Sequence, residues 1–492
     1  MSKQTQIIDG RGVASIARNL TYLLGGQGVN FITRFLYAII VARVFSPQIY
    51  GMINYGIAWY LLFIPLTRMG METVLIRDVG KNRQKGAHEA SLNLTLRIAS
   101  IILVTVLYFI VSIIYETDPE SRLMVCVFAF ALIGRSLAWW TGSVYIAFEV
   151  NQYSFRQQTI FRSLEFLLGI LVIFIWKEAL LVVAVHGFVW CLEAVYGLII
   201  IRHRLFDLRL NFDFAGIKNV FKQGFPLGVM ILLMTLPVQG PLIFFRHIAS
   251  SGETLGQLAL AMQVLFILSN ISIALGSAAL PVLSRSVDRE DGKDRLYAET
   301  MIRYALLLGS AVALLGTAFG PSLIVQIFGH KYANAGTLIG SVLWLLIPYA
   351  IRHSLTGVLQ AARQDAHLLV GSLIGALFFA AAIFEAVIRY GALGSIVCSA
   401  AATTLTVIYF LFALNQRIKV DWRSSIIKPG MAVSLSVAVF YLLRFTGPVI
   451  SITGAFAILI LICYWFKCLT PQDVRWLRDA FVWMKGKVPY VK

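Results

Sequence analysis

Charged residues are scarce in this chain of 492 residues, in which Asp, Glu, Lys and Arg together make up only 13%. Long hydrophilic segments are also lacking. The longest, at about 202–222, is too short to form a soluble domain, which excludes an appended catalytic domain. Acidic residues are the rarer charged kind, 24 against 42 basic ones, so the formal net charge is +18.

Motifs for nucleotide hydrolysis and metal binding are missing as well. The Gly-Lys pairs that begin at Gly80, Gly292 and Gly486 lack the upstream glycine and the following hydroxyl of a phosphate-binding loop, so ATP hydrolysis is not expected. The five cysteines, an odd number without Cys-x-x-Cys spacing, suggest neither disulfides nor a metal site. We therefore expect no metal and no cofactor.

What the chain has in abundance is apolar sequence, since 59% of its residues are hydrophobic and they occur in long runs. The uncharged stretches 254–284, 304–329 and 390–416 each exceed the roughly 20 residues that cross the hydrocarbon of a bilayer. The sequence predicts an all-α integral membrane protein with fourteen transmembrane helices. The expected spans are near 16–42, 50–75, 91–115, 122–148, 157–176, 179–201, 223–245, 255–283, 299–320, 336–361, 367–388, 391–415, 429–445 and 447–466.

Basic residues are distributed unevenly between the loops on the two sides of these spans. The side that holds the N-terminus receives 28 of the 42, and the opposite side receives seven. By the positive-inside rule, both termini are expected in the cytoplasm and the protein in the cytoplasmic (inner) membrane. The positive net charge is thus explained by the basic loops on the cytoplasmic side of the membrane, so no nucleic-acid partner is expected. Because the first 15 residues lack an apolar core, the first helix is expected to act as an uncleaved insertion signal.

A weak internal repeat links the first helical hairpin to the seventh and eighth helices. Segment 42–51 corresponds to 245–256, with Gly51 opposite Gly256. The offset spans six helices, an even number, so both halves would keep one membrane orientation. Chance similarity between apolar hairpins is the alternative.

The repeat divides the chain into four units. They are an N-terminal lobe of six helices (1–208), a C-terminal lobe of six helices (209–420), two extra helices (421–466) and a cytoplasmic amphipathic tail (467–492). In the tail, Thr470 and Pro471 are typical of a helix start, and basic and tryptophan residues among apolar ones predict that it lies on the inner membrane surface.

Five short strings carry a resemblance to a known family by their order and spacing. Together they resemble the lipid-linked oligosaccharide flippases of the polysaccharide synthesis group, within the multidrug/oligosaccharidyl-lipid/polysaccharide exporter superfamily, over nearly the whole chain. The strings are Ala42–Gly51, Phe225-Pro226-Leu227, Ala279–Arg285, Ile327–Ala335 and Leu359–Arg363.

This resemblance implies a transporter rather than an enzyme. Two pseudo-symmetric six-helix lobes would surround a central cavity, with two extra C-terminal helices. By alternating access, a polyprenyl-pyrophosphate-linked oligosaccharide would move from the cytoplasmic to the outer leaflet for surface polysaccharide assembly. The expected partners are that lipid-linked glycan, membrane lipid, and a polysaccharide polymerase or other assembly proteins.

Seven arginines fall inside the predicted spans. A cation at the bilayer centre costs from about 3 to more than 10 kcal/mol, so such residues normally face water, a partner or an anionic ligand. Arg97, Arg162 and Arg303 lie within two helical turns of the cytoplasmic boundary, where they are expected to reach the headgroups. Glu165, three residues after Arg162, offers that arginine a local salt bridge.

The other four arginines lie too deep for that explanation or sit at a predicted bend. Arg68 follows Pro65 and precedes Met69-Gly70, where a helix can kink. Guanidinium groups bind phosphate oxygens bidentately and stay charged at physiological pH. We therefore predict a site for the substrate's pyrophosphate and glycan made by Arg34, Arg68, Arg135 and Arg352.

Carboxylates inside the predicted spans are candidates for ion coupling, because they commonly carry protons or sodium in transporters. They are Glu165, Glu193 and Glu385. Each could instead neutralise an arginine on a neighbouring helix, and His186 is expected to be a core residue with its hydrogen bonds satisfied. Aromatic side chains could stack on sugars or simply occupy interfaces and cores. These aromatic residues are Tyr37, Trp139, Trp140, Tyr145 and Trp344.

Two other functions fit the sequence less well. A cation-coupled drug or metabolite exporter of the same fold is disfavoured, since cationic drugs need an acidic cavity. A membrane-embedded glycan polymerase or ligase generally has a large outer loop with catalytic groups, whereas every outer loop predicted here has about 15 residues or fewer.

Overall fold

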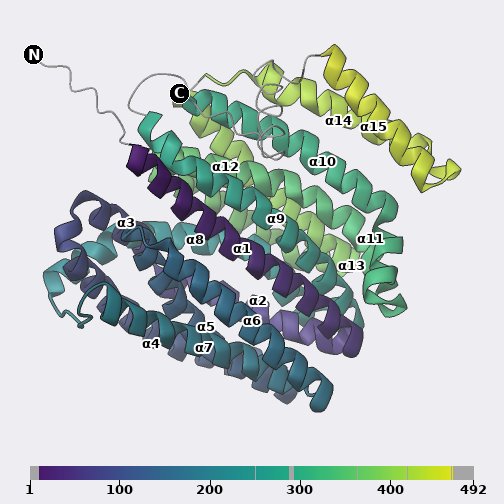
Figure 1. The fold of residues 1–492 in the computed structure, drawn as a ribbon. Helices are drawn as coiled ribbons and strands as arrows, with labels where there is room; N and C mark the ends of the chain where they lie inside the picture. Colours follow the sequence, from purple (N-terminus) through teal and green to yellow (C-terminus); the bar gives the residue numbers. More distant parts are fainter. Residues whose placement is uncertain are drawn as a thin grey trace, which may run out of the picture.

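The computed structural model describes residues 10–249, 251–286, 293–362, 364–417, 419–466 and 468. Within these ranges every regular element is helical, and twelve helices are long and apolar enough to cross a membrane (Figure 1). The expected all-α membrane class is therefore confirmed. The count of fourteen remains a prediction, and the predicted tail helix lies outside the described residues.

The first six predicted spans each correspond to a helical segment, and the second is broken in two. Pro65 lies inside this segment, and Met69 and Gly70 take left-handed φ values of 41° and 65°. The bend predicted beside Arg68 is confirmed. The helices are α1 (Gly10–Val44), α2 (Pro47–Arg68), α3 (Met71–Lys81), α4 (Gly86–Tyr115), α5 (Pro119–Ala147), α6 (Asn151–Ile175) and α7 (Ala179–Arg204).

The later spans are also helical, and two of the predicted ones are merged in α13. A straight helix of 53 residues would be about 80 Å long, far more than a bilayer's hydrocarbon. Gly391, at φ 57° and ψ −135°, breaks it, and Gly375 packs against Thr406 on the returning arm. The helices are α8 (Phe214–Ile248), α9 (Gly252–Ser286), α10 (Lys293–Phe328), α11 (Ala333–Val342), α12 (Leu346–Ala361), α13 (Asp365–Arg417), α14 (Lys428–Leu442) and α15 (Pro448–Trp465).

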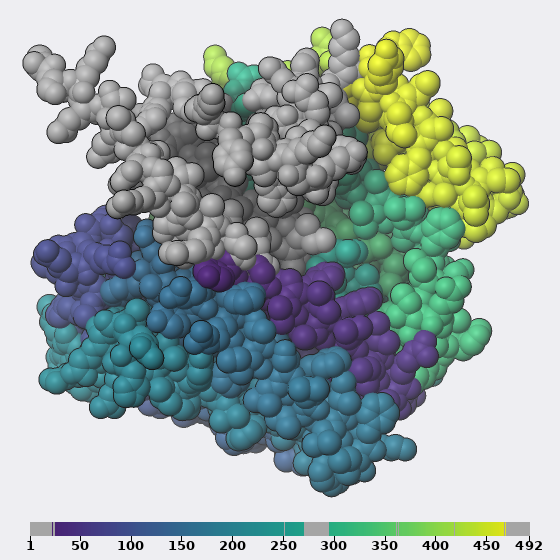
Figure 2. Space-filling model, in the orientation of Figure 1, coloured from purple at the N-terminus to yellow at the C-terminus, as the bar shows by residue number. Residues whose placement is uncertain are grey.

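The N-terminal and C-terminal parts of the chain gather on different sides of the molecule. Helices α4 to α7 lie on one side, α10, α14 and α15 lie on the other, and α1 runs between them (Figure 1). Figure 2 shows α1 in purple between the blue and green helices. Outward-facing side chains include Leu103, Ile114 and Leu442, which are more than half exposed, as expected of a surface that faces lipid.

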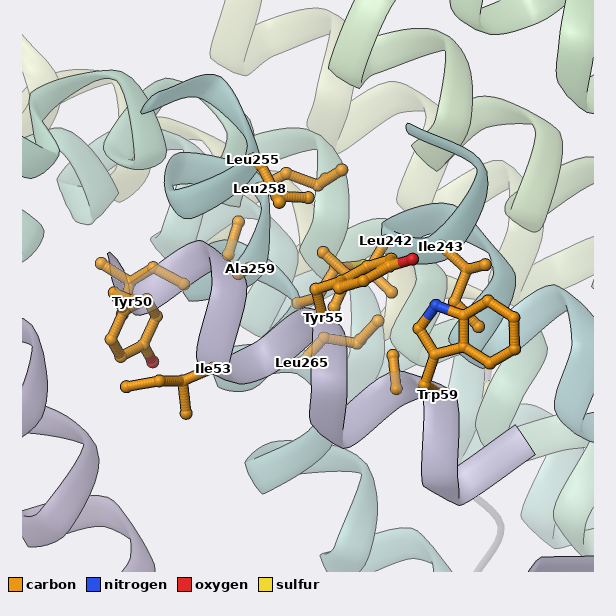
Figure 3. Packing of buried hydrophobic residues seen from close by; sticks show 14 of the residues in the cluster. Tyr50, Ile53, Tyr55, Trp59, Leu242, Ile243, Leu255, Leu258, Ala259 and Leu265 are labelled. Carbon is orange, nitrogen blue, oxygen red and sulfur yellow. The ribbon is translucent and has the colours of Figure 1, made fainter. Parts of the chain in front are cut away.

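Helices α2, α8 and α9 form the packed seam between the two parts. Aromatic and aliphatic side chains of α2, among them Tyr55 and Trp59, pack against Leu242 and Ile243 of α8 and against several leucines of α9 (Figure 3). The backbones of α2 and α9 approach closely. A Cβ atom on Gly51 would lie 2.7 Å from the Gly256 nitrogen, and one on Gly256 would overlap the carbonyl oxygen of Pro47.

Gly51 and Gly256, the two residues that the weak repeat aligns, thus meet in space. We call this end of the molecule the Gly51–Gly256 end. Two sets of polar contacts also join the N-terminal and C-terminal parts there. Arg43 donates through Nε to the Ile327 carbonyl (2.7 Å), and Lys331 Nζ donates to the Phe45 carbonyl (2.6 Å).

The other set surrounds the C-terminal end of α8. His247 Nε2 lies 2.8 Å from the Tyr55 hydroxyl and 3.2 Å from Glu116 Oε1. Its neighbour Arg246 lies 3.9 Å from Asp118, at the start of α5. The turns that precede α2, α5, α9 and α11 are therefore all located at the Gly51–Gly256 end.

Replacing Gly256 tests the close approach of α2 and α9. Gly256→Ala is expected to lower the stability by about 1–3 kcal/mol, because the new methyl group has no space beside Pro47. The melting temperature of the detergent-solubilised protein measures the effect. Gly142→Ala is the matched control, since a Cβ there meets nothing within 4 Å. Equal melting temperatures for the two variants would contradict the packing described.

Candidate functional site

All four arginines predicted to bind substrate line one cavity of about 500 Å³. Helices α1, α2 and α5 form one wall, and α8, α9 and α12 form the other. No Asp or Glu is found among the described residues that line it. The four are Arg34 on α1, Arg68 at the end of α2, Arg135 on α5 and Arg352 on α12.

Arg68 is the one cavity arginine with a carboxylate partner in the described part of the chain. Its Nε lies 2.9 Å from both Glu72 oxygens. Glu72 also accepts a hydrogen bond of 2.9 Å from Arg97 Nη2, so two guanidinium groups share one carboxylate. The left-handed turn at Met69 and Gly70 places Glu72, on α3, beside the end of α2.

Arg135 and Arg352 are held without a carboxylate. Arg135 donates to the Tyr60 hydroxyl (2.7 Å) and lies 4.5 Å from the centre of the Trp139 ring. Arg352 donates to the Met234 carbonyl (3.1 Å). Both side chains are more than nine-tenths buried, and each Nε has no partner among the described residues. Neutral hydrogen-bond acceptors and aromatic ring faces thus support these charges without cancelling them.

Arg34 forms neither an ion pair nor a hydrogen bond within the described ranges. Together with Arg135 and Arg352, it gives the cavity three guanidinium groups that no carboxylate pairs with directly. In a low-dielectric surrounding, unbalanced charge of one sign attracts a ligand of the opposite sign. The cavity therefore suits a compact anion.

The remaining three arginines do not reach the membrane surface, so that expectation was wrong. Arg97, Arg162 and Arg303 are only 0%, 3% and 3% exposed. Carboxylates balance the first two, since Arg97 bonds to Glu72 and Arg162 pairs with two glutamates. The distance of a residue from its own helix end does not reveal which groups neighbouring helices present to it.

Those two glutamates are Glu165, on the same helix, and Glu193, on α7. The predicted salt bridge between Arg162 and Glu165 is confirmed, and Glu193 pairs with the same arginine from a neighbouring helix. Glu385 differs, because it is exposed and pairs with Arg389 one turn further along α13.

A continuous chain of polar contacts connects the cavity with this ion pair. From Arg135 it passes through the Tyr60 hydroxyl to His186 Nε2 (3.0 Å), and from His186 Nδ1 to Glu165 Oε1 (2.6 Å). Glu165 then contacts Arg162. His186 is therefore a core residue with both ring nitrogens satisfied, as predicted.

The cavity also contains groups that the sequence did not single out. Of the five aromatic candidates for sugar stacking, Trp139 is the one that lines it, with its ring against Arg68 and Arg135. The unforeseen polar residues include side-chain amides within apolar helices, a pattern that can mark a functional interior. Among these polar residues are the amides Asn54, Gln239, Gln263 and Gln360, together with His353.

A family model described as "Polysaccharide biosynthesis protein" matches residues 16–287, more than half of the chain. No curated protein sequence matches this chain.

Solved structures are similar at low sequence identity. The lipid II flippase MurJ in an inward closed conformation has a TM-score of 0.69 at 12% identity, covering 90% of this chain and 98% of that one. A MOP superfamily transporter from Pyrococcus furiosus has a TM-score of 0.61 at 14% identity, covering 82% and 95%. An inward-facing multidrug resistance MATE transporter scores 0.60 at 13% identity, covering 79% and 94%. The fold is thus that of MOP superfamily transporters.

Removing a paired arginine should cost more stability than removing one without a carboxylate. Arg162→Ala leaves Glu165 and Glu193 buried beside each other without their cation, which is expected to destabilise the protein by about 3–5 kcal/mol. Arg352→Ala removes a charge that no carboxylate balances, and it should leave the melting temperature of the purified protein nearly unchanged. A larger loss for Arg352→Ala than for Arg162→Ala would refute the assignment of partners.

Proposed function

The chain belongs to the polysaccharide biosynthesis protein family, and on that premise we propose that it is a flippase for a polyprenyl-pyrophosphate-linked oligosaccharide. The lipid-linked glycan enters from the cytoplasmic leaflet and leaves to the outer leaflet by alternating access. It then serves surface polysaccharide assembly, in which a polymerase or other assembly proteins are the expected partners.

The observation that carries this proposal is the unbalanced positive charge of the cavity. Arg34, Arg135 and Arg352 have no carboxylate partner among the described residues, and Arg68 shares its carboxylate with Arg97. A pyrophosphate diester carries about two negative charges and several acceptor oxygens, which guanidinium groups bind bidentately. The lipid tail meanwhile stays in the membrane.

The architecture that we propose has fourteen transmembrane helices in two six-helix lobes, residues 1–208 and 209–420, with helices of 421–466 outside them. The twelve spanning helices, together with α1 and the break in α13, support this number. Both termini are cytoplasmic in this arrangement, so the Gly51–Gly256 end faces outward. Release to the outer leaflet then requires the contacts at that end to separate.

Glu165 and Glu193 are the proposed ion-coupling residues. Their shared ion pair with Arg162 is connected to Arg135 through His186 and Tyr60, so a change of protonation there alters the field at the cavity. Glu385 is not included, because it is exposed and paired on its own helix.

Exchange of a cationic drug or metabolite is the second candidate, and the MATE-like neighbours share its fold. The cavity disfavours it. A cationic ligand would need a carboxylate, and among the described lining residues the charged side chains are arginines.

Alanine substitutions in cells whose surface glycan depends on this chain test the proposal. Arg34→Ala, Arg135→Ala and Arg352→Ala are each expected to reduce surface glycan by at least about tenfold with unchanged protein amount, because each removes a charge-assisted contact to pyrophosphate. Arg68→Ala should have a smaller effect.

The matched control is Arg389→Ala, which removes an exposed arginine paired with Glu385 and should leave export normal. Full glycan export by all of the cavity variants would overturn the assignment of the pyrophosphate site.

A further inference from the structure

Three of the four side-chain amides that line the cavity lie in a different part of it from most of its arginines. Gln239 on α8, Gln263 on α9 and Asn54 on α2 all line the cavity, and α2, α8 and α9 are the helices that form the seam between the two parts of the chain. Their depth can be measured along each helix from the Gly51–Gly256 end, where Gly252 lies against Gln48.

With a rise of about 1.5 Å per residue, the amides are close to that end. Asn54 is seven residues from the start of α2, Gln239 is nine from the end of α8, and Gln263 is eleven from the start of α9. They therefore lie at depths of about 10, 14 and 17 Å.

Three of the arginines are deeper when measured in the same way. Arg135 is sixteen residues from the start of α5, Arg352 nineteen from the start of α11, and Arg68 twenty-one from the start of α2. Their depths are about 24, 28 and 32 Å. Arg34, ten residues from the end of α1, is level with the amides at about 15 Å. Three of the four amides thus lie, with Arg34, nearer the Gly51–Gly256 end than the other arginines do, and the fourth, Gln360, lies beyond Arg352.

The amides have hydrogen-bonding capacity that the protein does not use. Gln239 is only 8% exposed, yet its side chain makes no hydrogen bond with the described residues. The side chain of Gln263, which is half-buried, makes none with them either. Asn54 Nδ2 donates to the Tyr50 carbonyl (2.9 Å), and its Oδ1 has no such partner. A primary amide offers two donors and one acceptor oxygen, which complement hydroxyl and acylamino groups.

We propose that Asn54, Gln239 and Gln263 form a subsite for the sugar attached to the pyrophosphate. This inference rests on the proposed function. With the pyrophosphate held by Arg135 and Arg352 and reached by Arg34, the first sugar extends toward the Gly51–Gly256 end and hydrogen-bonds to the amides through its hydroxyl and acylamino groups. Arg34 lies at the junction of the two subsites. These amides then distinguish a glycan-bearing lipid from the bare lipid pyrophosphate.

Two probes separate the sugar subsite from the pyrophosphate site. The full-length purified protein is titrated with undecaprenyl pyrophosphate, and then with the same lipid bearing one N-acetylhexosamine. The wild-type protein is expected to bind the sugar-bearing lipid about tenfold more tightly, the scale of one or two good hydrogen bonds. Gln239→Leu and Gln263→Leu should reduce this difference to less than about twofold while binding of the bare lipid is unchanged.

Gln360→Leu is the matched control. Gln360 lines the same cavity eight residues beyond Arg352, about 12 Å further from the amides, so this variant should keep the tenfold difference. Unchanged binding of the bare lipid shows that each variant is folded.

The possible failures are distinguishable. A wild-type protein that binds the bare lipid but gains nothing from the sugar would overturn the sugar subsite, as would a gain that survives in both glutamine variants. Failure of the wild type to bind the bare lipid pyrophosphate would instead contradict the proposed function.

Discussion

A guanidinium group inside a membrane protein must be stabilised by a partner, by water or by a ligand, and this constraint organises the interior described above. Arg97 and Arg162 meet it with carboxylates, which balance their charge within the protein. Arg34, Arg135 and Arg352 form no ion pair with a carboxylate in the described ranges, and all three line one cavity. The same constraint thus separates arginines that stabilise the fold from arginines that can bind an anion.

The fold places one kind of arginine beside carboxylates and the other kind at the cavity. The break at Met69 and Gly70 turns α3 back so that Glu72 reaches both Arg68 and Arg97. Close packing of α2 with α9 joins the N-terminal and C-terminal parts at the Gly51–Gly256 end and leaves the cavity between their walls. Because the walls come from different parts of the chain, a relative movement of these parts would change access to the arginines.

The sequence was sufficient to predict the helices, the bend beside Arg68 and the four arginines of the cavity. The depth of each of these arginines in its helix, and the apolar residues around it in the sequence, are properties of a single helix that the sequence reveals. The partners that other helices supply are not visible in the sequence, so the burial of Arg97 beside Glu72 was missed. Gln239 and Gln263 were missed for a related reason, since an isolated amide in an apolar helix becomes informative once its neighbours show that it lines a cavity.

Transport by the purified protein tests the central claim most directly. The protein is reconstituted into liposomes with a fluorescent polyprenyl-pyrophosphate oligosaccharide, and a membrane-impermeant quencher measures how much of the lipid crosses between leaflets. The account predicts crossing that depends on the protein and is faster than in protein-free liposomes. Crossing at the protein-free rate, together with transport of a cationic dye by the same liposomes, would contradict it.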